Sequence, residues 1–246
     1  MGKIITVYGQ HGSGKTTVAV NLAYMLAERY VVGIINTQYT YPSIQHFFGL
    51  NIPQEKSFHS IYLSPNRTRD LPQQFVQHSS RKNLFLLSVP DGTTYLTFAD
   101  KNSMPDKETA IDMLLDAQEK FDYLIVDSDN DLDNVLSDFA LVYADKVVYL
   151  IKPDIQGFAY SKAHSELLDD LKVSQNKRIY VANMDKNYLG LDKFEQLLSC
   201  KIDISLPYDG QIEVAANEGF PAMEIGTGKR AKGEFLKLYR EVTENG

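Results

Sequence analysis

The sequence predicts an α/β protein with a doubly wound, mainly parallel sheet that carries helices on both faces. Short apolar runs alternate with longer helical patterns along all 246 residues, which is typical of strands joined by crossover helices. Most of the apolar runs contain few polar residues, as in strands that are covered on both faces. No repeat, low-complexity tract or linker divides the chain, so we expect one domain over residues 1–246.

The order of these patterns defines the expected elements. The apolar runs predict strands over residues 3–8, 31–36, 83–89, 122–127, 146–151, 178–183 and 201–206. The helical patterns predict helices over residues 14–29, 43–49, 107–119, 131–142, 158–173, 190–199, 211–218 and 230–243. The region from Asn51 to Lys82 contains three prolines and shows no clear period. It therefore predicts either short helices or a mobile insertion.

Composition excludes several classes of function. The 32 acidic and 25 basic residues give a net charge of −7, which argues against a surface coated with nucleic-acid-binding charge. Cys200 is the only cysteine, so the chain has neither an internal disulfide nor a site built from several cysteines, and a reducing cytoplasm is the expected compartment. No apolar run approaches the ~20 residues that cross a bilayer, and we expect no membrane span.

The first predicted strand, KIITVY, is followed directly by the glycine-rich sequence GQHGSGKT, residues 9–16. This sequence satisfies the pattern G-x-x-x-x-G-K-[ST], in which backbone N–H groups surround a phosphate. We expect Gly12, Ser13, Gly14, Lys15, Thr16 and Thr17 to bind the nucleotide. In such a loop the lysine reaches the β- and γ-phosphates and the Thr16 hydroxyl is a magnesium ligand, while the helix that begins after Gly14 directs its positive end at the phosphates.

A carboxylate is also needed, because magnesium on a triphosphate requires an acidic group to orient its water shell. The apolar segment FDYLIVD ends in Asp127, which we predict to be that group, acting through water. The next acidic residues are Asp129, Asp131 and Asp133. We interpret these three as solvated residues that cap the start of the following helix.

Later segments narrow the choice among phosphate-loop proteins. ADKVVYLIKPD, RIYVANMDK and LPYDGQIEVAANEGFP follow the loop and the Asp-ended strand, and together they resemble the ParA/MinD superfamily of partition and positioning ATPases, outside residues 51–82. The resemblance implies a P-loop NTPase fold of the SIMIBI type, ATP and Mg²⁺ as ligands, and an ATP sandwich homodimer.

The same resemblance implies a site for the adenine base. Asn183 and the backbone around Pro207, Tyr208 and Asp209 are the expected contacts. An asparagine amide offers both a donor and an acceptor to a base edge. The alternative for Asn183 is a turn residue at the end of a strand.

Three positions depart from the family pattern. Gln10 replaces a lysine that in the family reaches the partner subunit's nucleotide, while Asn36 and Gln38 replace two carboxylates that follow the second strand. Amides orient water but carry no charge and cannot accept its proton. We therefore expect weak or degenerate ATP hydrolysis, with Lys15 and Asp127 as the remaining catalytic residues.

The sequence thus predicts a nucleotide-dependent dimeric switch that acts in partitioning or spatial positioning and recruits an unidentified adaptor or cargo protein. The alternative is a non-hydrolysing localisation or scaffold factor of the TadZ/CpaE-like branch, which serves pilus or secretion assembly. Nonspecific DNA binding through basic residues between Lys229 and Arg240 is a further alternative that we do not favour, because of the acidic net charge.

Overall fold

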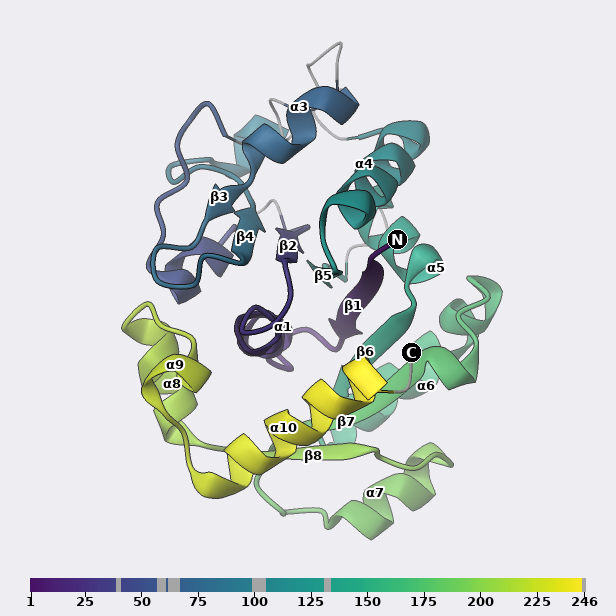
Figure 1. Cartoon of the computed structure of the whole chain (residues 1–246). Helices are drawn as coiled ribbons and strands as arrows, with labels where there is room; N and C mark the ends of the chain where they lie inside the picture. The colour runs from purple at the N-terminus through teal and green to yellow at the C-terminus, as the bar shows by residue number, and fades with distance from the viewer. Residues whose placement is uncertain (39–40, 57–60, 62–66, 99–104, 131–133, 245–246) are drawn as a thin grey trace.

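The structure, a computed structural model, describes residues 1–38, 41–56, 61, 67–98, 105–130 and 134–244. Its centre is an eight-stranded sheet with the strand order β3-β4-β2-β5-β1-β6-β7-β8 (Figure 1). The strands are β1 (Lys3–Gly9), β2 (Val32–Asn36), β3 (Val76–Gln77), β4 (Leu84–Leu87), β5 (Tyr123–Asp127), β6 (Lys146–Ile151), β7 (Arg178–Asp185) and β8 (Ile204–Pro207). Every pair of neighbours is parallel except β3 and β4. The predicted mainly parallel sheet is confirmed.

Helices connect the strands and cover both faces of the sheet. The α-helices are α1 (Lys15–Leu26), α3 (Arg67–Gln74), α4 (Lys107–Lys120), α5 (Val135–Tyr143), α6 (Ile155–Asp170), α7 (Leu191–Leu198), α8 (Gly210–Asn217), α9 (Ala222–Ile225) and α10 (Lys229–Glu244). The described residues also form the short 3₁₀ helices η1 (Ile44–Phe48), η2 (Tyr95–Phe98) and η4 (Gln175–Lys177). Within the described part of the chain, none of these helices is both long and apolar enough to cross a membrane.

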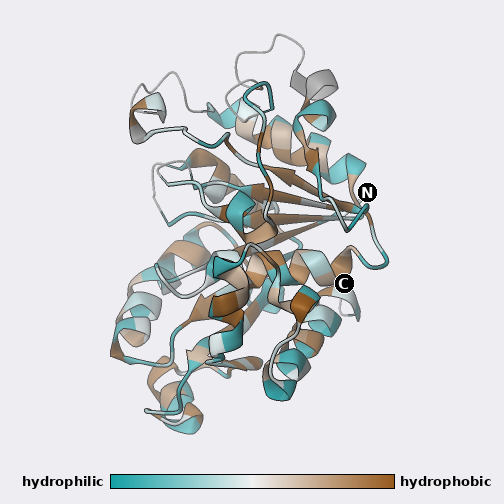
Figure 2. Cartoon of the chain, turned by 90° about the vertical axis from the view of Figure 1, so that its left-hand side faces the viewer, coloured by the Kyte–Doolittle hydropathy of each residue, from teal (hydrophilic) through white to brown (hydrophobic). Residues whose placement is uncertain are grey.

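Alternating side chains of the strands divide the core between the two faces. On β1, Ile5 and Val7 pack toward α1 and α10, while Ile4 and Tyr8 point to the opposite face, which α3 to α7 cover. Apolar residues therefore occupy both sides of the central strands, and Figure 2 shows hydrophobic colour along the strands inside the molecule. This two-sided burial is the reason that the strands read as nearly continuous apolar runs in the sequence.

The connections reverse direction beside β1. Helix α1 follows β1 on one face and leads toward β2, whereas α5 joins β5 to β6 on the opposite face. Strand β1 lies between β5 and β6, so the carboxyl ends of β1 and β5 meet at the point where the strand order reverses. In open α/β sheets, ligands bind outside such a point. The pairing of Asn36 with Asp127 brings the end of β2 to the same edge.

The short elements are where the predictions were incomplete or wrong. The segment 43–49 contains a 3₁₀ helix rather than an α-helix, and β3, α3 and α9 were not predicted as separate elements. A strand of two residues or a helix of one turn gives no periodic signal. Of the alternatives for residues 51–82, the described part contains α3 and β3.

Two helix starts were also displaced by capping residues. Helix α5 begins at Val135 because the Asn134 side chain accepts a hydrogen bond from the Ser137 N–H, and α6 begins at Ile155 behind the Asp154 cap. The prediction that aspartates cap the first of these helices is therefore wrong for Asp129, since Asn134 is the cap. Asp131 and Asp133 lie outside the described residues.

Candidate phosphate-binding site

The glycine-rich loop joins the carboxyl end of β1 to the start of α1. Gly12 and Gly14 have φ values of 68° and 85°, a left-handed conformation that other residues rarely adopt. Among the described residues, no side chain caps α1 at Gly14, and its first turn contains no acidic residue. The first amides of a helix have no acceptor within that helix. The start of α1 therefore presents free N–H groups and a positive dipole end to an anion.

The Lys15 ammonium lies inside this loop, where other residues of the chain hold it. Its Nζ donates to the Gly9 carbonyl at 3.3 Å and to Oδ1 of Asn130. The Asn130 amide donates in turn to the same carbonyl and to the Tyr160 hydroxyl. Burial lowers the pKa of Lys15, whereas the charge of Asp127 opposes that shift.

Asp127 ends β5 and receives two hydrogen bonds on one carboxylate oxygen. Thr16 Oγ1 donates to Oδ2 at 2.7 Å, and Asn36 Nδ2 donates to the same oxygen at 2.8 Å. Burial raises the pKa of Asp127 to about 6, although the hydrogen bond from Thr16 and the charge of Lys15 lower it. A hydroxyl next to a buried carboxylate is a set of hard oxygen donors that fits Mg²⁺, and a cation here would offset the cost of the buried charge.

Two adjacent cavities lie at the carboxyl edge of the sheet. The smaller one, of about 290 Å³, is lined by Gly12, Gly14, Lys15, Thr16, Asp127 and other residues. The larger one, of about 880 Å³, lies toward α8. Thr17, Ser43, Phe47 and Met184 line both cavities. The two cavities are therefore neighbours, one at the phosphate loop and the other beside α8.

The residues predicted to surround adenine line the larger cavity. Asn183, Pro207, Tyr208 and Asp209 all contribute to its wall. The Asn183 Nδ2 donates to the Ser13 carbonyl at 2.6 Å, and the Asp209 carboxylate caps α8 and accepts from the Gly228 N–H. The structure therefore brings this group together, and it leaves the Tyr208 ring partly exposed at the rim.

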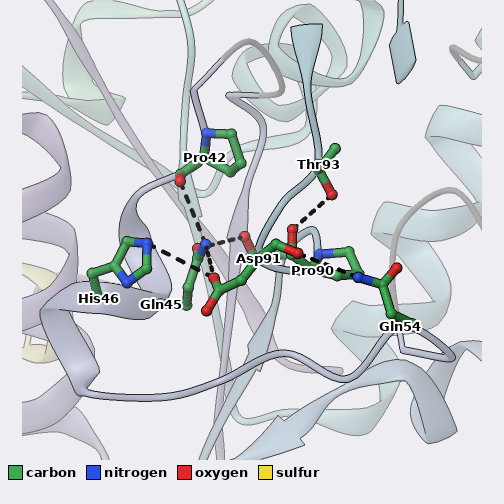
Figure 3. A network of polar contacts seen from close by, with 8 residues as sticks. Pro42, Gln45, His46, Gln54, Pro90, Asp91 and Thr93 are labelled. Carbon is green, nitrogen blue, oxygen red and sulfur yellow. Dashed lines mark hydrogen bonds and ion pairs between the residues drawn. The ribbon is translucent and has the colours of Figure 1, made fainter. Parts of the chain in front are cut away.

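The 3₁₀ helix η1 also lines the larger cavity, and a network of polar contacts holds it in place (Figure 3). The buried Gln45 side chain donates to Asp91 Oδ1 at 3.0 Å and accepts from the Ser88 hydroxyl. His46 Nε2 lies 3.8 Å from the same Asp91 oxygen, and Gln54 donates to the Asp91 carbonyl. The network fixes η1 against the segment that follows β4.

The three departures from the family pattern occupy different places. Gln10 is 7% exposed, and its side-chain oxygen accepts a hydrogen bond from the Lys152 N–H, so the side chain is directed toward the residue that follows β6. Asn36 contacts Asp127, and among the described residues its own Oδ1 has no partner. Gln38 lines the smaller cavity.

Some residues of the site were not predicted from the sequence. Asn130 binds Lys15, while Asp129, Ser43, Phe47 and Met184 line the cavities. Asn130 and Asp129 directly follow a strand whose end was predicted to bind magnesium, and that position was a usable signal. Ser43 and Phe47 carried none, because they reach the site only through the placement of η1.

Comparison with known proteins agrees with this geometry. The family model AAA_31, described as an AAA domain, matches residues 2–181. An uncharacterized ATP-binding protein of Methanocaldococcus jannaschii is 25% identical over 224 residues, which cover 89% of this chain and 77% of that protein.

Solved structures share the fold over nearly the whole chain. The septum site-determining protein MinD of Pyrococcus horikoshii, complexed with Mg-ADP, has a TM-score of 0.79 at 18% identity, covering 99% of this chain and 97% of its own. A ParA family ATPase from Chlorobium tepidum has a TM-score of 0.80 at 16% identity, covering 96% of this chain and 98% of its own. The predicted resemblance is thereby confirmed at the level of the fold.

Proposed function

Because the chain belongs to the AAA domain family AAA_31, we propose that it is a ParA/MinD-like ATPase that binds Mg-ATP and acts as a nucleotide-dependent dimeric switch in partitioning or spatial positioning. The observation that carries the proposal is the contact between Thr16 and Asp127, 2.7 Å long, beside the uncapped start of α1. It places a hydroxyl, a carboxylate, an ammonium and free amides around one cavity of about 290 Å³.

In this proposal the smaller cavity holds the polyphosphate and the metal ion. The loop amides and Lys15 bind the phosphate oxygens, while Thr16 and, through water, Asp127 hold Mg²⁺. Bound magnesium supplies positive charge that neutralises the phosphates. The structures of relatives support these ligands, since the MinD of Pyrococcus horikoshii was solved with Mg-ADP.

The larger cavity accommodates the nucleoside. Its wall contains Asn183, Pro207, Tyr208 and Asp209, and it shares Thr17 with the lining of the phosphate cavity. The curated relative described as ATP-binding supports an adenine nucleotide. Because the Asn183 amide nitrogen already donates to Ser13, its oxygen remains to accept a hydrogen bond from the exocyclic amine of adenine.

We propose that hydrolysis is slow. Asp127 and Asp129 are the described carboxylates that line the smaller cavity, and Asp127 is occupied by Thr16 and Asn36. Asn36 and Gln38 occupy the two positions at which the ParA/MinD pattern has carboxylates. An amide cannot act as a general base toward the attacking water. These amides also favour the second candidate, a non-hydrolysing localisation or scaffold factor of the TadZ/CpaE type. Phosphate release beside a Lys15→Ala control separates the two candidates.

We propose a homodimer linked by nucleotide, an unidentified adaptor or cargo protein, and a cytoplasmic location. Nonspecific DNA binding remains the less favoured alternative. Sedimentation with and without Mg-ATP tests the dimer, and loss of DNA binding as salt increases would be the mark of phosphate contacts.

Calorimetry tests the nucleotide site directly. Wild-type protein is titrated with ATP in the presence and absence of Mg²⁺, and compared with Lys15→Ala. Lys193→Ala, an exposed residue on α7, is the matched control. We expect saturable, magnesium-dependent binding to the wild type and to the Lys193 variant, with a loss of at least tenfold in Lys15→Ala. A folded wild-type protein that gives no saturation overturns the proposal.

A further inference from the structure

Asn183 lies near the carboxyl end of β7. It lines the larger cavity and also makes a hydrogen bond to the phosphate loop. It is 8% exposed, and its Nδ2 donates to the carbonyl of Ser13, a residue 170 positions earlier in the chain, at 2.6 Å. A carbonyl oxygen only accepts hydrogen bonds, so the nitrogen of the amide must face it. Among the described residues, no hydrogen bond is made to the Asn183 Oδ1, and Asn183 is part of the lining of the larger cavity.

The peptide that Asn183 contacts is the one that leads into α1. The Ser13 carbonyl and the Gly14 N–H belong to the same peptide group, which is planar and trans. In a trans peptide the C=O and N–H bonds point in opposite directions. Holding the Ser13 oxygen against Asn183 therefore directs the Gly14 N–H away from Asn183. Gly14 lines the smaller cavity, and Asn183 lines the larger one.

Packing around this peptide leaves little freedom for another arrangement. A Cβ atom added to Gly14 would lie 2.5 Å from the Asn183 Nδ2 and 3.2 Å from the Met184 side chain. Ser13 is fully buried, and its N–H donates to the Gln10 carbonyl at 3.0 Å. If Asn183 were truncated, the Ser13 carbonyl would lose the side-chain donor that holds it. A carbonyl without that donor would rotate toward another donor or admit water.

We infer that Asn183 is a positioning residue for the phosphate loop, which aims the Gly14 N–H at a bound phosphate whichever base is attached to that phosphate. The inference rests on the proposed function and extends it. Asn183 is predicted to contact adenine, but the structure gives its amide nitrogen to the loop. Its substitution therefore weakens the binding of polyphosphates that contain no base at all.

The test uses inorganic tripolyphosphate with Mg²⁺ as a probe without a base, and Mg-ATP as the complete ligand. Calorimetry compares wild type, Asn183→Ala and Tyr208→Ala, since Tyr208 lines the larger cavity and, among the described residues, its side chain makes no hydrogen bond to the loop. We expect Asn183→Ala to weaken both ligands by at least fivefold. Tyr208→Ala should weaken Mg-ATP while changing tripolyphosphate affinity less than twofold.

The outcomes separate the inference from the proposed function. If Asn183→Ala loses Mg-ATP affinity but binds tripolyphosphate within twofold of wild type, the inference is wrong and the proposed function stands. A wild-type protein that binds Mg-ATP but not tripolyphosphate also overturns it. If the wild type binds neither ligand, both fail.

A second measurement does not depend on ligand binding or on a single variant. The ¹⁵N–¹H signal of Gly14 is compared in ligand-free wild type, Asn183→Ala and Asn183→Ser, with far-UV circular dichroism as the check on folding. Both variants should shift the Gly14 signal, because the peptide that contains this amide loses its donor at the Ser13 carbonyl, while Tyr208→Ala leaves the signal unchanged. An unchanged Gly14 amide in a folded Asn183 variant would refute the inference.

Discussion

The Asp127 side chain is buried, so its negative charge in the ionised form is costly to the folded state. Its carboxylate accepts from Thr16 and Asn36 on one oxygen, yet burial still raises its pKa to about 6. A buried carboxylate that is only partly compensated destabilises the folded state. Such a cost is common at functional sites, where a ligand later compensates it.

Replacing Asp127 with asparagine should stabilise the ligand-free protein at neutral pH. The pKa of this group rises from 3.8 in the unfolded chain to about 6 in the folded chain, so ionisation lowers the free energy of unfolding by about 3 kcal/mol above pH 7. The folded state takes up this proton first as the pH falls, and the advantage of Asp127→Asn should shrink to about half by pH 5. Urea denaturation without Mg²⁺ at pH 7.5 and pH 5 measures both values. A variant less stable than wild type at pH 7.5 would contradict the prediction.

Asn36 should contribute to the stability of the ligand-free protein, because its amide donates a hydrogen bond to Asp127 where an acidic residue would place a second negative charge. In Asn36→Asp, an oxygen replaces the nitrogen that now lies 2.8 Å from Asp127 Oδ2, and two carboxylates that close repel one another. Without metal, the free energy of unfolding should fall by about 1–3 kcal/mol, and Mg²⁺ should restore part of the loss. Asn36→Ala is the control, since it removes the hydrogen bond but adds no charge. Equal magnesium dependence in the two variants would argue against this account.

At the scale of elements, the site depends on η1 as much as on α1. The loop and the start of α1 are local structures, whereas η1 is a 3₁₀ helix of five residues with little stability of its own. Its position depends on the contacts of Gln45 with Asp91 and Ser88 (Figure 3). Ser43 and Phe47, at this helix, line both cavities.

Removing the Asp91 side chain should therefore weaken both the fold and nucleotide binding. In Asp91→Ala the buried Gln45 amide loses an acceptor, which should cost about 1–3 kcal/mol of folding free energy. Displacement of Phe47 should raise the dissociation constant for Mg-ATP several-fold. Gln54→Ala, which removes an exposed contact to the Asp91 backbone, is the matched control and should change stability by less than about 0.5 kcal/mol. Calorimetry and urea denaturation test both variants, and equal effects of the two would disprove the role of the network.

At the scale of the whole molecule, the site exists only when the sheet is assembled. It draws Lys15 from α1, Asp127 from β5 and Asn183 from β7, and these strands lie on both sides of β1. The unfolded chain therefore has no equivalent site. A ligand that binds only the folded state raises its stability in proportion to the logarithm of its concentration.

Mg-ATP should accordingly increase the thermal stability of the folded protein. At a ligand concentration one hundred times the dissociation constant, the gain should be about 2.7 kcal/mol. Scanning calorimetry over a series of Mg-ATP concentrations measures the shift, and Lys15→Ala should show little of it. A similar shift in that variant would mean that the stabilisation does not arise at the phosphate loop.

Prediction from the sequence succeeded for features whose residues are consecutive in the chain. The strand β1, the loop at Gly12 and Gly14, and the start of α1 occupy one continuous stretch, and their backbone conformation follows from local residue types. Asp127 was recognisable because it ends an apolar strand. The two-residue strand β3 was not recognisable, because so few residues carry no period, and the helix predicted over residues 43–49 is a 3₁₀ helix rather than an α-helix.

The sequence by itself determined the alternation of strands and helices, the phosphate loop and the ends of the strands that meet at the site. The tertiary structure alone decided that Asn130 holds Lys15, that Asn36 donates to Asp127, and that Asn183 turns its amide nitrogen to Ser13. The physical reason is the separation of these partners, which lie 91 to 170 residues apart in the chain. Local preferences fix backbone conformation over a few residues, whereas the direction of a buried amide follows from whichever partner the packed sheet brings to it.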